Sequence, residues 1–81
     1  MSWDVVDGKL TRSFELPSFP AAIAFVTQVA DIAEEQNHHP DIDIRWRTVT
    51  LAVNTHDQGG AITDKDHALA AAVDGLPVPE V

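Results

Sequence analysis

The sequence predicts an α+β domain: a four-stranded antiparallel sheet with helices packed on one face, in the element order β-β-α-β-β-α. Three observations lead to this fold class. Residues 9–16 and 41–53 alternate apolar and polar side chains as strands do, residues 18–37 show helical periodicity, and residues 63–75 carry helix start and stop signals. Strand pairs separated by helices in this order favour an antiparallel sheet with helices on one side. We expect a single domain over residues 1–81.

A hairpin begins the fold. The Asp-Gly pair at residues 7–8 lies between two short runs, and Asp-Gly is a favoured two-residue turn because its central residues adopt positive φ. After the turn, Leu10, Phe14 and Leu16 share one strand face. Arg12 falls on the same face and is its polar exception.

The first helix is bounded by local signals. Ser18 can act as the N-cap, Pro20 suits the first turn, and Asn37 tolerates the left-handed conformation that closes a helix. Pro40 disfavours helical geometry at the residue before it. One half of the helix surface is apolar: Phe19, Ala22, Ile23, Phe25, Val26, Val29, Ala30, Ile32 and Ala33. We expect an amphipathic helix of about 17 residues.

The second strand pair contains a change of parity. Ile42 and Ile44 lie on one face, whereas Val49 and Leu51 continue with the opposite parity. This predicts either a bulge or two strand segments that meet near Arg47.

The second helix has its own signals. Thr63 can cap it, Asp66 stands three places on as in a capping box, and Gly75 ends it. The segment before it, "HDQGG" at residues 56–60, is typical of a turn.

Composition limits the possible partners. The formal charge of -8, from 13 acidic residues against 5 Lys plus Arg, repels nucleic acid and anionic membranes, so we expect neither as a partner. No apolar run approaches the roughly 18 residues that cross a bilayer, and no secretion signal is evident, so we expect a cytoplasmic protein. A chain of 81 residues without cysteine has a thin core and no disulfide or thiolate zinc site, so we expect a homo-oligomer.

Three histidines stand where the chain bends: His38 and His39 after the first helix, and His56 after the last strand. An imidazole both gives and takes protons near neutrality. Two such rings facing one cavity could protonate a leaving hydroxyl and remove a proton elsewhere on the same substrate. The pattern therefore favours a dehydration or a tautomerisation.

Roles without catalysis stay open for these histidines. A histidine near a helix C-terminus also stabilises the helix dipole, and His67, in the second helix, is expected to be a solvated surface residue. Metal binding is less favoured because adjacent residues in extended backbone, such as His38 and His39, point to opposite sides. The sequence also contains no Gly-rich phosphate loop and no nucleophile elbow.

These residues resemble the signature of the pterin-4a-carbinolamine dehydratase family. That signature is an acid, three residues, His-His-Pro, an aromatic residue, a later Thr-His, and an Asp that opens the last helix. The matching positions are Glu34, His38, His39, Pro40, Trp46, Thr55, His56 and Asp66. Weaker similarity from Trp3 onward extends the resemblance over nearly the whole chain. Family members usually carry a further helix before this point, so we expect an N-terminally shortened member.

The resemblance implies that the protein removes water from a 4a-hydroxytetrahydropterin and forms a quinonoid dihydropterin, with no metal and no organic cofactor. It implies that His38 and His56 are the acid/base pair, and that His39 and Asp66 bind the substrate. The interval from His56 to Asp66 is one residue longer than the family pattern, which could shift the position of Asp66.

The remaining signature residues have supporting roles, and a second function stays open. We expect Glu34 either to orient the histidine corner or to touch the substrate, and Trp46 to be cavity wall or, preferably, core. The fold also resembles non-enzymatic relatives that act as dimerisation or assembly cofactors. In either case we expect a homodimer or homotetramer.

Overall fold

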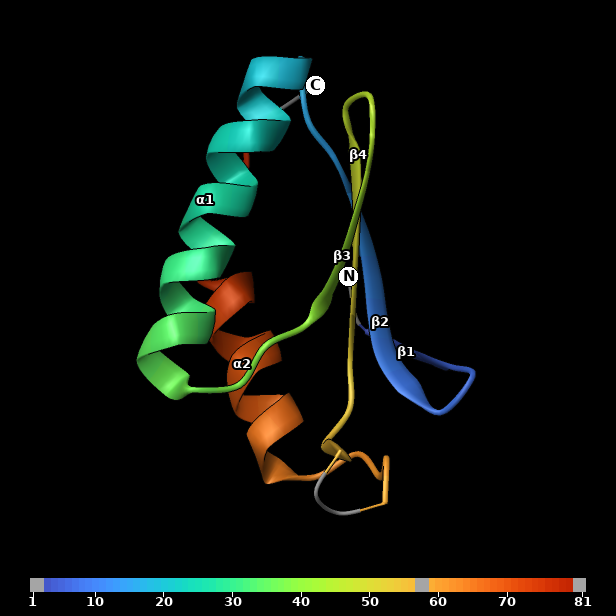
Figure 1. Cartoon of the computed structure of the whole chain (residues 1–81). Coiled ribbons are helices and arrows are strands. Elements are labelled where there is room, and N and C mark those ends of the chain that lie inside the picture. Colours follow the sequence, from blue (N-terminus) through green and yellow to red (C-terminus); the bar gives the residue numbers. More distant parts are fainter. Residues whose placement is uncertain (1–2, 57–58, 80–81) are drawn as a thin grey trace.

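In the computed structural model, two helices lie on one face of a four-stranded antiparallel sheet (Figure 1). The structure describes residues 3–56 and 59–79. The elements are β1 (Asp4–Val6), β2 (Lys9–Glu15), α1 (Phe19–Gln36), β3 (Asp41–Arg45), β4 (Thr48–Val53) and α2 (Asp64–Asp74). The strand order β1-β2-β4-β3 places β2 and β4 at the centre and β1 and β3 at the edges. The predicted fold class and element order are confirmed.

The β1–β2 hairpin forms at the predicted turn. Asp7 and Gly8 have φ of 51° and 76°, the positive values that a two-residue hairpin turn needs. Val5 pairs with Leu10 and Val6 with Lys9. The turn therefore sets a register in which Leu10 and Phe14 point into the core.

The parity change is explained by a second hairpin. Residues 46–47 form a turn between β3 and β4, in which Arg45 pairs with Thr48. Trp46 adopts a left-handed φ of 56° and is 70% exposed, with the Arg47 guanidinium 5.0 Å from its ring centroid. The expectation that Trp46 belongs to the core or to the cavity wall is therefore wrong. Its position at a tight turn directs it into solvent instead.

The core lies between the central strands and the two helices. It consists of Leu10, Phe14, Leu16, Ala22, Phe25, Val29, Val49, Leu51, Val53, Leu69, Ala70 and Val73. On α1 the buried stripe is narrower than the predicted apolar half: Phe19 and Ile23 stay 47% and 40% exposed. The sheet and α2 cover only part of that half.

Arg12, the polar exception on β2, is held by a partner from the other end of the chain. Its Nη1 lies 2.5 Å from Asp74 Oδ1, and its guanidinium carbon lies 4.3 Å from the ring centroid of Phe14. Trp3 Nε1 donates to the same carboxylate at 2.9 Å. The end of α2 is thereby tied to the first two strands.

The described part of the chain contains no helix that is long and apolar enough to cross a bilayer.

Candidate functional site

The end of α1 positions His38 and His39. Asn37 closes the helix in the left-handed conformation, with φ 51° and ψ 45°. Its N–H bonds to Glu34 O at 3.3 Å and the N–H of His38 bonds to Ala33 O at 3.0 Å, the paired bonds of a Schellman motif. The backbone of His38 is thus fixed to the last turn of α1. Pro40, half-buried, follows and leads directly into β3.

The end of β4 positions His56. Thr55, the residue before it, is buried and pairs with Ala61 through a backbone bond of 2.9 Å, and Thr55 O accepts from Gly60 N at 3.1 Å. Asn54 Nδ2 donates to Gly60 O at 3.2 Å. Gly59 and Gly60 form the predicted turn with positive φ, while positions 57 and 58 of that segment lie outside the described residues. Gly59 N donates to His56 O at 3.1 Å, so His56 lies at the edge of this turn.

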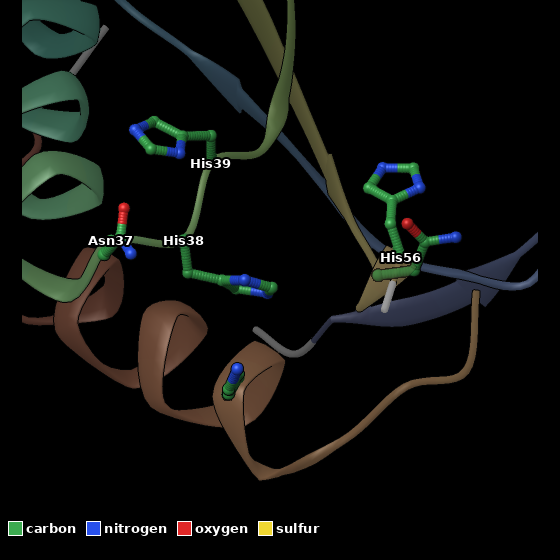
Figure 2. Close-up of a pocket in the computed structure, with 6 residues that line it drawn as sticks. Asn37, His38, His39 and His56 are labelled. Carbon is green, nitrogen blue, oxygen red and sulfur yellow. The ribbon is translucent and has the colours of Figure 1, made fainter. Parts of the chain in front are cut away.

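These two segments meet at one cavity of about 330 Å³. Figure 2 shows the three histidines around it. His38 and His39 lie in the segment that connects α1 to β3, and His56 lies on the opposite side of the cavity. The described residues that line it are Asn37, His38, His39, Asn54, His56 and Lys65. Its volume is at the lower end of the range of small-molecule sites, about 300–1,000 Å³. The three histidines therefore line one cavity, as a shared acid/base function requires, with the His39 ring turned toward α1 in Figure 2.

The cavity wall has an unusual composition for an acidic protein. Each of its six described residues carries a nitrogen in the side chain, as an amide, an imidazole or an ammonium group, and none carries a carboxylate. Such a wall offers hydrogen-bond donors and, through amide oxygens and unprotonated ring nitrogens, acceptors as well. It suits a ligand that is rich in carbonyl oxygens and ring nitrogens.

Asp66 lies beneath this wall rather than on it. Its side chain has no exposed surface, and its Oδ1 is 2.6 Å from His38 Nε2. Its Oδ2 accepts from Thr55 Oγ1 and from the backbone N of Thr63, both at 2.8 Å. Both oxygens are thus engaged by protein groups, so the geometry points to a contact with His38 in place of the expected contact with substrate. The longer interval after His56 has not moved Asp66 away from the site.

The protonation state of Asp66 follows from these bonds. Burial by itself raises the pKa of the carboxyl group, but hydrogen bonds from His38, from the Thr63 backbone and from Thr55, with the charge of His38, lower that pKa below the ordinary 3.8. Asp66 is therefore ionised at neutral pH. Because an ionised carboxylate only accepts hydrogen bonds, His38 Nε2 must donate its proton to Asp66. Nδ1 is then the nitrogen of this ring that can exchange protons with a ligand.

His39 has a different environment from its neighbour. Its Nε2 lies 2.5 Å from Glu34 Oε2, but the side chains of His39 and Glu34 are 56% and 78% exposed. Such a solvent-exposed pair contributes little stability, about 0–1 kcal/mol. Glu34 therefore orients His39 from the solvent side, while the adjacent His38 is held from the protein interior.

The remaining candidates fall outside the cavity. Trp46 follows the far end of β3 from His39, and His67 is exposed on α2, as expected for a surface residue. Within residues 3–56 and 59–79, no three His, Cys, Asp or Glu side chains are grouped to hold a metal ion.

The sequence reasoning missed four residues of the site. Asn37, Asn54 and Lys65 line the cavity, and Thr63 supports Asp66 from behind. In the sequence, each of these residues was either assigned as a helix cap or lay next to a candidate site residue. The available signal was position: Asn37 precedes the two histidines, and Lys65 precedes Asp66.

Comparison with known proteins bears directly on this site. The family model described as pterin 4 alpha carbinolamine dehydratase matches residues 1–76. The chain belongs to this family. A protein from Chloroflexus aurantiacus that carries the family's name is 58% identical over 74 residues, which are 91% of this chain and 78% of that protein. One from Roseiflexus castenholzii is 57% identical over 74 residues, with the same coverage.

Two solved structures of pterin dehydratase type share the fold. A transcriptional coactivator/pterin dehydratase from Brucella melitensis has a TM-score of 0.82 and 32% identity, over 90% of this chain and 79% of that chain. A pterin dehydratase-like protein, described as a RuBisCO assembly factor in the alpha-carboxysome, has a TM-score of 0.76 and 25% identity, over 91% and 87%. Pterin dehydratase relatives are thus named both for an enzyme activity and for an assembly role.

Proposed function

We propose that the protein dehydrates a 4a-hydroxytetrahydropterin to a quinonoid dihydropterin by histidine general acid/base catalysis. The observation that carries the proposal is the meeting of His38, His39 and His56, from two distant segments, at one cavity whose described lining residues all carry side-chain nitrogens. Membership of the dehydratase family supports it. The donors match the carbonyl oxygen and ring nitrogens of a pterin.

The proposed step is an elimination of water across the C4a–N5 bond. His38 Nδ1 accepts the proton of N5, the electrons of the N5–H bond form the C4a=N5 double bond, and the C4a–O bond breaks. His56, protonated, gives its proton to the leaving hydroxyl, which departs as water. Asp66 stabilises the imidazolium that forms on His38, because its Oδ1 is already bonded to Nε2. Each positioned group of this kind contributes about 100- to 10,000-fold.

We assign the other site residues to binding and support. His39, steadied by Glu34, holds the pterin and its 4a-hydroxyl group. Thr55 and Asp66 support His38 from beneath, and Pro40 keeps the corner extended. This mechanism uses no metal or organic cofactor.

A stopped-flow ultraviolet assay with freshly made 4a-hydroxytetrahydropterin tests the proposal. We expect acceleration over buffer that disappears in His38→Ala and in His56→Ala. His67→Ala is the matched control, because it removes an exposed histidine outside the cavity and should leave the rate unchanged. No acceleration by the unaltered protein, or equal loss in all three variants, would reject the proposal.

The alternative function is a dimerisation or assembly cofactor, favoured by exposed apolar surface. Phe19 and Ile23 on α1, Ile42 and Ile44 on β3 and the adjoining Trp46 are large apolar side chains left in solvent. Such surface marks interaction sites. A stoichiometric complex whose affinity survives simultaneous His→Ala changes at positions 38, 39 and 56 would support this function. It is independent of the dehydratase proposal, and both can hold.

We also propose that the protein is a homodimer or homotetramer in the cytoplasm, associated through sheet edges. Support comes from β3, an edge strand with all five residues exposed, because an uncovered edge strand presents unpaired backbone groups to a second chain. Sedimentation velocity at micromolar concentration should show an oligomer. A stable monomer would contradict the proposal.

A further inference from the structure

A continuous chain of side-chain hydrogen bonds runs behind the cavity from α2 to His38. Thr63 Oγ1 lies 2.7 Å from Thr55 Oγ1, Thr55 Oγ1 lies 2.8 Å from Asp66 Oδ2, and Asp66 Oδ1 lies 2.6 Å from His38 Nε2. We propose that Thr55 and Thr63 are positioning residues that hold His38 in the Nε2–H tautomer by fixing the carboxylate of Asp66. The catalytic use of that tautomer rests on the proposed function, but the tautomer itself does not.

The direction of every bond in this chain is determined. The carboxylate of Asp66 only accepts, so the single hydroxyl proton of Thr55 is used on Oδ2. In the contact between the two hydroxyls, Thr63 must then be the donor. The oxygen of Thr63 in turn accepts from Lys65 N at 3.3 Å. The hydroxyl protons of Thr55 and Thr63 are therefore both committed, and neither bond can run in the opposite direction.

The hydrogen bonds to Asp66 leave its carboxylate little freedom to rotate. Oδ2 accepts two bonds, from Thr55 and from the backbone of Thr63, and Oδ1 accepts one from His38. Turning the group would break at least one of these bonds inside the protein, where an unmade bond is costly. Oδ1 is therefore kept in the direction of Nε2. Among residues 3–56 and 59–79, the ring of His38 bonds to Asp66 through Nε2 and no side-chain hydrogen bond involves Nδ1.

The residues of this hydrogen-bond series are held by ordered backbone. Asp66 lies in the first turn of α2, where the positive end of the helix dipole stabilises a carboxylate. Thr55 is held by its pairing with Ala61. His38 is held by its backbone bond to Ala33. The side chain of Glu34, the partner of His39, is 78% exposed, whereas that of Asp66 is fully buried, so the two adjacent histidines are held with different rigidity.

The experiment is nitrogen-15 NMR of the imidazole rings, at a pH where His38 is neutral. The two ring nitrogens have separate shifts that identify the protonated one. In the unaltered protein we expect His38 to be predominantly Nε2–H, with Nδ1 unprotonated. In Thr55→Val, which keeps the shape and removes the hydroxyl, the tautomer ratio should fall about two- to tenfold, the size of one net hydrogen bond. Thr55→Ser should restore it.

Thr50→Val is the matched control. It is the same substitution at a threonine within β4, five positions before Thr55, and it also breaks a hydroxyl–hydroxyl contact, that of Thr50 with Ser13 at 2.8 Å. Thr50 has no contact with Asp66, so the His38 tautomer should be unchanged. Thr63→Gly provides a second test, because glycine keeps most of the capping preference. It should lower the tautomer ratio in the same direction as Thr55→Val.

The outcomes separate this inference from the proposed function. A His38 that is Nδ1–H in the unaltered protein, or a tautomer ratio unchanged in both Thr55→Val and Thr63→Gly, would overturn the inference even if the protein is an active dehydratase. A ratio lowered in those variants and restored in Thr55→Ser would support it even if no dehydratase activity is found. If the protein is active, kcat should fall with the tautomer ratio while KM changes less than twofold.

Discussion

Asp66→Asn removes one charge from the interior while keeping the shape of the side chain. In the structure, three donors converge on the two oxygens of Asp66, from His38, Thr55 and the backbone of Thr63. An asparagine has only one oxygen, and its NH₂ group cannot accept. If that oxygen keeps the bonds of Thr55 and Thr63, the NH₂ group faces His38 Nε2. The ring must then give up its proton there and become the Nδ1–H tautomer.

The magnitude follows from the bonds that are lost. A hydrogen bond to a charged group contributes about 1.5–3 kcal/mol, and at least the bond from His38 is replaced by an unfavourable contact. We expect the free energy of unfolding to fall by about 2–3 kcal/mol at neutral pH. Because small domains have about 5–15 kcal/mol of stability, the variant should still fold. Its kcat should fall about 100- to 10,000-fold, since the base nitrogen is then protonated.

The loss of stability should also depend on pH. The pKa of Asp66 is lowered in the folded protein, so its contribution is fully present above the unfolded value of about 3.8 and is lost as the pH falls through the folded pKa. Asparagine does not titrate. The difference in unfolding free energy between the two proteins should therefore shrink as the pH falls below about 3.8.

Urea unfolding followed by far-ultraviolet circular dichroism at several pH values measures this difference. Asp74→Asn is a useful control, because it removes a carboxylate that pairs with Arg12 far from the cavity. It should leave kcat unchanged. An Asp66→Asn protein as stable and as active as the unaltered one, or a stability difference that is the same at pH 7 and pH 2.5, would refute the reasoning.

Three further substitutions test separate parts of the structure. Glu34→Gln should lower stability by less than about 0.5 kcal/mol, because its pair with His39 is solvent-exposed; steady-state kinetics should show a higher KM with little change in kcat. Trp46→Ala should change the unfolding free energy by no more than about 0.5 kcal/mol and the dehydration rate by less than twofold; a large loss of either would mean that Trp46 is not in the exposed turn. Gly8→Ala should destabilise the β1–β2 hairpin by about 1 kcal/mol, because φ is +76° there, measured as a lower urea midpoint with an unchanged slope.

Turns and helix ends could be predicted well because their causes are local. Residues 7–8 form the expected turn, Ser18 and Thr63 cap the two helices, and Asn37 closes α1 in the left-handed conformation. Each of these depends on backbone preferences and on bonds between residues a few places apart. A short stretch of sequence therefore contains all the residues that determine such a turn or helix end.

Burial was predicted less well because it depends on which surfaces are covered. The apolar half of α1 includes Phe19 and Ile23, which periodicity places next to the core, yet both remain exposed. Trp46 was expected to be cavity wall or, preferably, core, but the turn between β3 and β4 places it in solvent. Periodicity reports where apolar side chains lie on an element, and only packing decides how wide the covered area is.

The amino-acid sequence alone determined the elements, the bends between them and the presence of three histidines at those bends. Only the tertiary structure decided which carboxylate serves which histidine. Glu34 reaches His39 across five positions, within one helix end, whereas Asp66 reaches His38 across 28 positions. That second contact exists because α2 packs beside the end of α1 with its first turn facing the corner, and the packing of two elements is a property of the whole fold.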